Sequence, residues 1–298
     1  MRIGIIGLGK MGFNLSKNLL RNNHEVVAFD SNREIQEKAE SEGIETADSL
    51  KDLCMKIGER KVIWIMIPNG LPVDNTIKEL LGELSEKDII IDGGNSNYKE
   101  SIRRYKELKE KNIDFIDCGT SGGTSGALNG ACLMVGGDTE PVSYCEKIFT
   151  DIAVKDGYLH VGGAGSGHFT KMVHNGIEYG MMQAIAEGFE VLHKSDYDMD
   201  YEKVARVWNN GSVIESWLME LAENLFKKDA KLEKIKGIMN SSGEGKWTVE
   251  TALDLEVPTP VIALSLMMRY RSLEENTFSG RVVAALRNEF GGHKVEKA

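Results

Sequence analysis

The sequence of 298 residues predicts an α/β fold with a doubly wound, mostly parallel sheet, followed by an all-α C-terminal domain. Three observations support this prediction. Short apolar runs alternate with amphipathic segments in the first half, a glycine-rich turn follows the first run, and the second half shows only long helical patterns. The length fits two domains. We place the first at residues 1–163 and the second at residues 164–298.

The first domain is expected to alternate strands and helices. Continuous apolar runs bounded by turns are typical of parallel strands that are covered on both faces. We expect strands at residues 2–6, 25–29, 62–67, 89–91, 115–118, 132–135 and 158–161, and helices at residues 11–20, 34–42, 73–84, 98–110 and 141–148. Right-handed crossovers then place the ligand crevice at the carboxyl edge of the sheet.

Composition excludes several classes of partner. The chain has 36 Lys and Arg against 46 Asp and Glu, a net charge of −10, and it lacks basic clusters. Nucleic acid and an anionic membrane surface are therefore not expected, whereas an anionic small molecule is. No apolar run reaches the ~18 residues of a spanning helix. Cys54, Cys118, Cys132 and Cys145 lack CxxC spacing, so we expect buried thiols in a cytoplasmic protein and no metal site.

A glycine-rich turn joins the first strand to the first helix. Its sequence is Gly7-Leu8-Gly9-Lys10-Met11-Gly12, and an acid, Asp30, follows the second strand. The glycines allow a tight turn, close approach of a pyrophosphate and close helix packing, while the helix N-terminus attracts the anion. An acid at the end of the second strand accepts the adenosine ribose hydroxyls. A glycine-rich turn without a nucleotide is the alternative, but the context favours a Rossmann-like dinucleotide site.

Asp30 also bears on the choice of cofactor, because a carboxylate there repels the 2′-phosphate of NADP. Arg33 could turn toward that phosphate, or it could be a solvated charge at the start of the next helix. We therefore favour NAD and keep NADP as possible. The expected cofactor-binding residues are Gly7, Leu8, Gly9, Lys10, Met11, Gly12, Asp30, Ile67, Pro68, Asn69 and Asn95.

Two more glycine-rich turns follow later strands, at residues 92–96 and 118–123. Both are expected at the carboxyl edge of the sheet, where loops face the crevice. Asn95 and Ser121 would add side-chain hydrogen-bonding groups to the backbone N–H groups of the glycines. Each turn alone is also compatible with ordinary turn chemistry.

The second half opens with a long helical pattern at residues 168–194. One face of that helix carries Lys171, His174, Asn175, Glu178 and Tyr179, because residues three and four apart share a face. Such groups cannot be buried against apolar partners without a large desolvation cost. The stripe is either solvated or part of a polar pocket, and the His-Asn pair in its middle favours the pocket.

Cationic side chains recur later in the chain. Lys246 lies in a glycine-flexed loop, Arg269 follows it, and the C-terminal segment contains Arg287 and His293. Arg and Lys on such turns suit a phosphate, which Arg binds in a bidentate fashion. The alternative for the C-terminal segment is a frayed surface tail.

Together these motifs resemble the decarboxylating 6-phosphogluconate dehydrogenases, a family of the β-hydroxyacid dehydrogenase superfamily. The length resembles their short, NAD-preferring bacterial class. The resemblance covers the whole chain. It is carried by the segments 7–12, 92–96, 119–123, 171–179, 245–248 and 287–293. The helix motif with its His-Asn and Glu-Tyr pairs is the most specific of these.

The resemblance implies a role for each residue. Lys171 would take the proton of the 3-hydroxyl while hydride passes to the nicotinamide, and would then stabilise the enolate oxygen after loss of CO2. Glu178 would protonate C1 to give ribulose 5-phosphate. The substrate would be held by Asn95, Ser121, Gly122, Gly123, His174, Asn175, Tyr179, Lys246, Arg269, Arg287 and His293. A lysine base needs a pKa of about 7–8, which burial or a nearby cation provides.

The resemblance also implies a homodimer or homotetramer in which Arg287 and His293 reach a neighbouring subunit's site. The chain lacks the second helical repeat of longer family members, and it carries Ser242 and Glu244 where they carry Lys and Thr. We expect Lys246 or Arg269 to compensate for the lost cation. Two other functions stay open: a β-hydroxyacid dehydrogenase or semialdehyde reductase, and a catalytically idle dinucleotide sensor.

Overall fold

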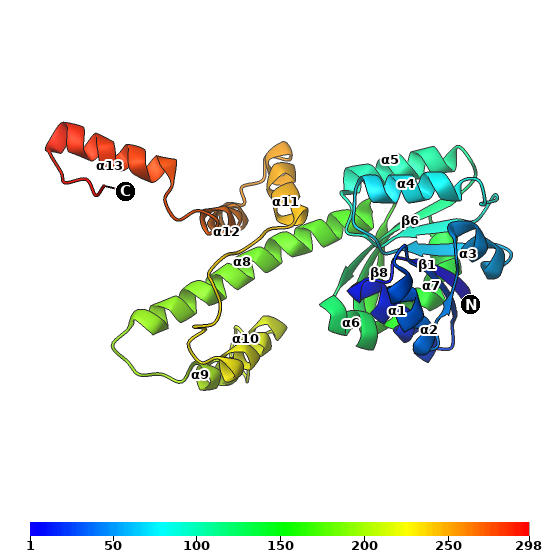
Figure 1. Ribbon diagram of the computed structural model, residues 1–298, viewed down its shortest axis with the longest axis horizontal. Coiled ribbons are helices and arrows are strands. Elements are labelled where there is room, and N and C mark those ends of the chain that lie inside the picture. The colour runs from blue at the N-terminus through cyan, green and yellow to red at the C-terminus, as the bar shows by residue number, and fades with distance from the viewer. Residues whose placement is uncertain (298) are drawn as a thin grey trace. The chain divides into compact units, whose positions relative to one another are not determined.

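A computed structural model of the protein describes residues 1–297. The chain divides into two compact units, Met1–His174 and Asn175–Ala298. Figure 1 labels the helices and strands of both. The last strand ends at Gly162 and the next helix begins at Ser166, which bracket the boundary expected near residue 163. The placement of the domain boundary stays a prediction.

The first unit contains a mixed sheet with the strand order β3-β2-β1-β4-β5-β6-β7-β8. Neighbouring strands run parallel except β6 and β7, which are antiparallel. The predicted doubly wound, mostly parallel fold is therefore confirmed. The strands are β1 Arg2–Ile6, β2 Glu25–Phe29, β3 Glu45–Thr46, β4 Val62–Ile65, β5 Ile89–Asp92, β6 Asp114–Ser121, β7 Ala131–Gly137 and β8 Ala153–Gly162.

Helices cover both faces of this sheet because its central strands are apolar on both sides. Side chains of α1, α2 and α7 pack into one core cluster, and those of α3, α4 and α5 pack into another. Figure 1 shows α1 and α4 on opposite sides of the sheet. The helices of this unit are α1 Lys10–Arg21, α2 Arg33–Ser41, α3 Leu50–Ile57, α4 Leu71–Leu80, α5 Tyr98–Lys109, α6 Gly123–Asn129 and α7 Thr139–Ile152.

Three elements and one burial prediction differ from expectation. The sequence pattern did not indicate β3, α3 or α6. Strand β3 is a two-residue edge strand, and α6 begins at Gly123 in a glycine-rich segment of low helix propensity. The eight-residue helix α3 has no such explanation. Cys132 was expected to be buried with the other cysteines, and this was wrong: it is exposed. Successive side chains of a strand point to opposite faces, so Cys132 points away from the core cluster that contains Leu133.

The described residues of the second unit form helices joined by loops and no strand, as predicted. The long helix α8, Ser166–Lys194, begins in the first unit and continues into the second. A small core forms around Phe189, Met219 and Phe226. The remaining helices are α9 Tyr201–Trp208, α10 Trp217–Lys228, α11 Gly243–Asp254, α12 Pro260–Arg271 and α13 Phe278–Gly291.

Candidate active site

The glycine-rich turn after β1 has the geometry of a pyrophosphate site. Gly7 has a φ of +95°, and a Cβ on Gly12 would lie 2.0 Å from the carbonyl oxygen of Gly7. Both positions therefore require glycine. A Cβ on Gly9 would meet nothing within 4 Å, which leaves room for a ligand beside the backbone. No side chain caps α1 where it begins at Lys10, so the first N–H groups of this helix remain available to bind an anion.

Asp30 is fixed beside this turn. Its Oδ2 accepts a 2.7 Å hydrogen bond from the Leu8 amide, and its Oδ1 accepts one of 2.9 Å from the Asn32 amide. Arg33 faces acids instead: its guanidinium lies 3.5 Å from Glu37 and 3.4 Å from Asp48. The carboxylate is thus held at the end of β2, where a ribose would bind, while Arg33 is engaged with its own helix and loop.

The loops after β4 and β5 meet at the same edge of the sheet. Asn69 donates a 3.3 Å hydrogen bond to the carbonyl of Asn95, and a Cβ on Gly94 would lie 2.6 Å from the carbonyl oxygen of Ile67. Pro68 and Asn69 are exposed. Asn95 Oδ1 is buried and has no hydrogen-bond partner among the described residues. A buried acceptor of this kind needs a donor, and a bound cofactor or substrate would supply one.

A buried ion-pair network holds the loop that carries Asn95. The Arg104 guanidinium, 1% exposed, donates to Asp92 at 3.0 Å and to Asp74 at 2.7 Å. Ser96 also donates to Asp92, at 2.7 Å. Burial acts to raise the pKa of Asp74, but hydrogen bonds from Arg104 and Arg103 outweigh it and hold that pKa below its ordinary value. Sequence reasoning missed Arg104, because an arginine on an amphipathic helix is usually a surface residue.

Lys171 is buried at the start of α8, with 6% of its surface exposed. Its Nζ lies 3.5 Å from Nδ1 of His174, whose Nε2 lies 3.1 Å from Oγ of Ser121. A Cβ on Gly119 would lie only 2.3 Å from Cβ of Lys171. The structure therefore brings together Lys171, His174 and Ser121 next to β6. It excludes a fully solvated stripe on this helix face.

The second unit gathers a different set of predicted residues around Tyr179. The Tyr179 hydroxyl accepts a 3.1 Å hydrogen bond from the Ser242 amide and lies 3.1 Å from its Oγ. The Arg269 guanidinium stacks on the Tyr179 ring at 3.6 Å. A Cβ on Gly245 would lie 2.5 Å from that ring. Glycine thus allows α11 to approach Tyr179 closely, and no side chain caps the first N–H groups of α11.

The remaining predicted residues lie at other positions of the two units. Lys246 is exposed and pairs with Glu250 at 3.4 Å. Gly122 and Gly123, both with positive φ, form the turn from β6 into α6. Arg287 and His293 are exposed, the first on α13 and the second just after it. The half-buried Asn175 and Glu178 lie on α8 between Lys171 and Tyr179.

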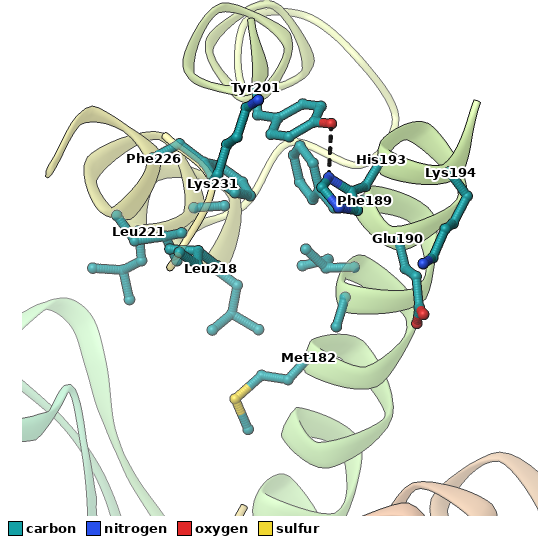
Figure 2. Close-up of a pocket in the computed structure, with 15 residues that line it drawn as sticks. Met182, Phe189, Glu190, His193, Lys194, Tyr201, Leu218, Leu221, Phe226 and Lys231 are labelled. Atoms are coloured by element: carbon teal, nitrogen blue, oxygen red, sulfur yellow. Dashed lines mark hydrogen bonds between the residues drawn. The ribbon is translucent and has the colours of Figure 1, made fainter. Parts of the chain in front are cut away.

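An apolar cavity of about 610 Å³ lies elsewhere in the second unit and contains none of these residues. Figure 2 shows it between α8 and α10, with Met182, Phe189 and Leu221 among the side chains that line it and a hydrogen bond between His193 and Tyr201 at its rim. Most of its lining is apolar, although Glu190, His193, Lys194, Tyr201 and Lys231 also line it. In residues 1–297 no group of three or more His, Cys, Asp or Glu could hold a metal, and no helix there is long and apolar enough to cross a membrane.

Comparison with known proteins decides the family. Residues 2–162 match the NAD binding domain of 6-phosphogluconate dehydrogenase, and residues 167–297 match its C-terminal domain. The chain belongs to the 6-phosphogluconate dehydrogenase family. The resemblance read from the motifs and the prediction of an NAD-binding domain are both confirmed.

Relatives of this family differ in length. A Haloferax volcanii protein named as the NAD(+)-dependent, decarboxylating 6-phosphogluconate dehydrogenase is 44% identical over 299 residues, covering 100% of this chain and 99% of its own. The Bacillus subtilis protein YqeC, provisionally named for the same enzyme, is 60% identical over 297 residues and 100% of both chains. The solved Plasmodium falciparum 6-phosphogluconate dehydrogenase superposes with a TM-score of 0.85 at 29% identity. The match covers 100% of this chain and 66% of that longer chain.

Proposed function

We propose that the protein catalyses the oxidative decarboxylation of 6-phosphogluconate to ribulose 5-phosphate and CO2, with NAD as the oxidant. The observation that carries the proposal is the buried amine of Lys171 with His174 and Ser121 beside it. An amine at this position, beside an imidazole and a hydroxyl, suits the general base that oxidation of a hydroxyl group requires. The solved Plasmodium relative is described with NADP+ and with 6-phosphogluconate.

The residues of this chain divide the chemistry between them. Lys171 takes the proton of the substrate's 3-hydroxyl, and the cofactor supplies the acceptor for the hydride of C3. Oxidation at the carbon β to a carboxylate gives a β-keto acid, whose decarboxylation needs only a cation at the developing oxyanion. Protonated Lys171 provides that cation. Glu178, seven residues further along the same helix and therefore on the same face, protonates C1 of the enediol.

The substrate's two ends have separate sets of ligands in this proposal. Asn95, with its unpartnered Oδ1, and the Ser121–His174 pair suit the hydroxyls and the carboxylate, together with Gly122, Gly123 and Asn175. The phosphate falls to the cluster around Tyr179 and Arg269, joined by Arg287 and His293. The geometry favours Arg269 over Lys246 as the compensating cation, because Lys246 is exposed and paired with Glu250.

The direct test is to incubate the purified protein with 6-phosphogluconate and NAD and to follow reduced cofactor and CO2 together. We expect both products in equal amounts. Lys171→Met should remove turnover while the substrate still raises the melting temperature, and Glu178→Gln should mainly slow product formation after decarboxylation. Lys194→Met, the same substitution at the far end of α8, is the matched control. Wild-type protein that forms neither product contradicts the proposal.

The preference for NAD rests on Asp30 and on the engagement of Arg33 by Glu37 and Asp48. We expect Asp30→Ala to narrow the ratio of kcat/KM for NAD over NADP by about tenfold or more, since it removes one charge repulsion and one ribose acceptor. Arg33→Ala should leave the ratio within about twofold. Steady-state kinetics with both cofactors measure this. An unchanged ratio in Asp30→Ala would exclude Asp30 from the choice of cofactor. Loss of activity with NADP in Arg33→Ala would instead give Arg33 a role in that choice.

The proposal includes a homo-oligomer whose C-terminal tail completes a neighbouring site. Helix α13 supports it, because none of its residues is buried in the single chain although Phe278, Leu286 and Phe290 are large, apolar and exposed. A helix of 14 residues with no buried face is only marginally stable by itself in water. Contact with a second copy would cover this helix and would bring Arg287 and His293 with it.

A further inference from the structure

We propose that Asp117 is a positioning residue for Lys171: it fixes the start of α8 to β6, so that the amine of Lys171 is held where the substrate's hydroxyl must lie. The inference rests on the proposed function of Lys171 and concerns a side chain that neither the motifs nor the comparisons single out. Every residue in the argument belongs to the first unit.

Asp117 is a fully buried carboxylate, 0% exposed, in the middle of β6. Its Oδ1 accepts a 2.6 Å hydrogen bond from the amide of Gly165, and its Oδ2 accepts one of 2.7 Å from the amide of His168. These amides belong to the first turn of α8 and the residue before it. Both carboxylate oxygens thus bind orphan N–H groups at a helix N-terminus, which is the favourable end for a negative charge.

The backbones around this clamp are packed too closely for side chains. A Cβ on Gly167 would lie 2.5 Å from the carbonyl oxygen of Asp117 and 2.7 Å from the amide nitrogen of Gly136. A Cβ on Gly119 would lie 2.3 Å from Cβ of Lys171. Helix α8 therefore touches β6 at two places, through the clamp at Asp117 and through the contact at Gly119.

The two contacts lie at separate points of both elements. Asp117 and Gly119 are two residues apart on a strand and so lie on one face, about 6.6 Å apart. His168 and Lys171 are three residues apart on the helix, about 4.5 Å along its axis, and lie on one face of it. Two contacts at separate points limit both the rotation and the translation of the helix relative to the strand. A single contact would leave the helix free to pivot.

This clamp matters because general-base catalysis depends steeply on position. A displacement of about 1 Å at the reacting atoms can cost on the order of 100-fold in rate. In Asp117→Asn, one carboxylate oxygen becomes an NH2 group that faces an N–H donor, so one of the two hydrogen bonds is lost and two donors oppose each other. The start of α8 must then shift, and Lys171 moves with it.

Asp114 provides a matched control on the same strand. It is also a buried aspartate of β6, and burial raises the pKa of its carboxyl. It lies at the opposite end of the strand, where it pairs with Ile89 of β5. Asp114→Asn makes the same chemical change in the same strand at a distance from Lys171.

The experiment compares kcat, KM for 6-phosphogluconate and melting temperature in the full-length wild type, Asp117→Asn and Asp114→Asn. We expect Asp117→Asn to lower kcat by about 30-fold or more while KM stays within about threefold, and Asp114→Asn to keep kcat within about twofold. If Asp117 had a purely structural role, Asp117→Asn would lower the melting temperature, and the folded variant would keep its kcat. Wild-type kcat in Asp117→Asn, or an equal loss in both variants, overturns the inference.

Two further measurements keep the test decisive. If Asp117→Asn does not fold, Gly119→Ala takes its place, because it leaves both hydrogen bonds of Asp117 and pushes against Lys171; retained kcat there overturns the inference. If the wild type does not act on 6-phosphogluconate, the proposed function fails by itself. Amide hydrogen exchange then tests the clamp: faster exchange at residues 165–171 in Asp117→Asn than in Asp114→Asn supports it, and equal exchange overturns it.

Discussion

Two cations of the second unit, Arg269 and Lys246, have different surroundings. Lys246 lies in the first turn of α11, and Arg269 lies against the ring of Tyr179. Arg269 stacks on the Tyr179 ring at 3.6 Å and donates a 2.9 Å hydrogen bond to the carbonyl of Asn240. Lys246 is exposed and pairs with a glutamate one turn further along the helix. A stacked guanidinium is preorganised for bidentate binding of phosphate, whereas a solvated ammonium is not.

This difference predicts unequal effects of removing each charge. Arg269→Met should raise KM for 6-phosphogluconate by about 10- to 100-fold, the equivalent of one hydrogen bond to a charged group at ~1.5–3 kcal/mol. Lys246→Met should change KM by less than about threefold. Steady-state kinetics at fixed saturating NAD measure both. A larger effect at Lys246 would give it the compensating role and remove it from Arg269.

Single residues were predictable where chemistry and spacing coincided. The stripe on the helix predicted a shared pocket for Lys171 and His174, the resemblance added Ser121 to the same site, and the three side chains lie next to one another. Asp117 and Arg104 were not expected. Each acts through partners far away along the chain, and a local pattern carries no information on which buried acid will meet which amide or guanidinium. The sequence pattern also failed to predict that Cys132 is exposed, because its thiol lies on the face of β7 opposite the core cluster of Leu133.

Helix α5 anchors the turn after β5, and two consecutive arginines of α5 allow the anchor to be tested. Arg104 is buried and donates to Asp92 and Asp74. Its neighbour Arg103 is partly exposed and pairs with Glu100 and Glu107 at the surface, and it shares Asp74 with Arg104. Breaking a buried ion pair by removing one partner leaves the other charge uncompensated, at a cost of about 3–5 kcal/mol. A surface pair contributes about 0–1 kcal/mol.

Arg104→Met should therefore lower the free energy of unfolding by about 3–5 kcal/mol, because Asp92 is left buried without its guanidinium. Arg103→Met should lower it by about 1 kcal/mol, because Arg104 still pairs with Asp74 in that variant. Urea denaturation followed by circular dichroism measures both values. The folded fraction of Arg104→Met should also bind NAD more weakly, since the loop with Asn95 loses its anchor. Equal losses in the two variants would mean that the buried network contributes no more than a surface pair.

Elements were predictable where period and length were unambiguous. Continuous apolar runs located the central strands, and glycine-rich turns located the carboxyl edge that faces the ligand. The edge strand β3 is too short to produce a pattern. Helix α6 forms against its sequence preference: its Gly126 packs under Ser121, where a Cβ would lie 3.2 Å from the carbonyl oxygen. Tertiary contacts stabilise a helix of this kind, and a short stretch of sequence does not show those contacts.

At the scale of the whole molecule, the C-terminal part of the second unit has little cover from the rest of its own chain. Helix α13 has no buried residue, and the described tail after it exposes His293. Sequence motifs indicated the cations at 287 and 293, and only the resemblance implied that they reach a neighbouring subunit's site, because motifs carry no information on assembly. A closed dimer with a shared surface is the commonest solution for such a chain.

A mixture of two inactive variants distinguishes a tail that serves its own chain from one that serves a neighbour. Lys171→Met subunits lack the base but keep the tail, while Arg287→Met subunits keep the base but lack the tail's guanidinium. In a dimer of one of each, the intact Lys171 meets an intact Arg287 only if the tail crosses between subunits. Co-expression at equal amounts should then restore activity to about a quarter of wild type, since half of the dimers are mixed and each has one complete site. Because neither parent has a complete site in either arrangement, activity that stays at the level of the parents would place the tail in its own chain's site.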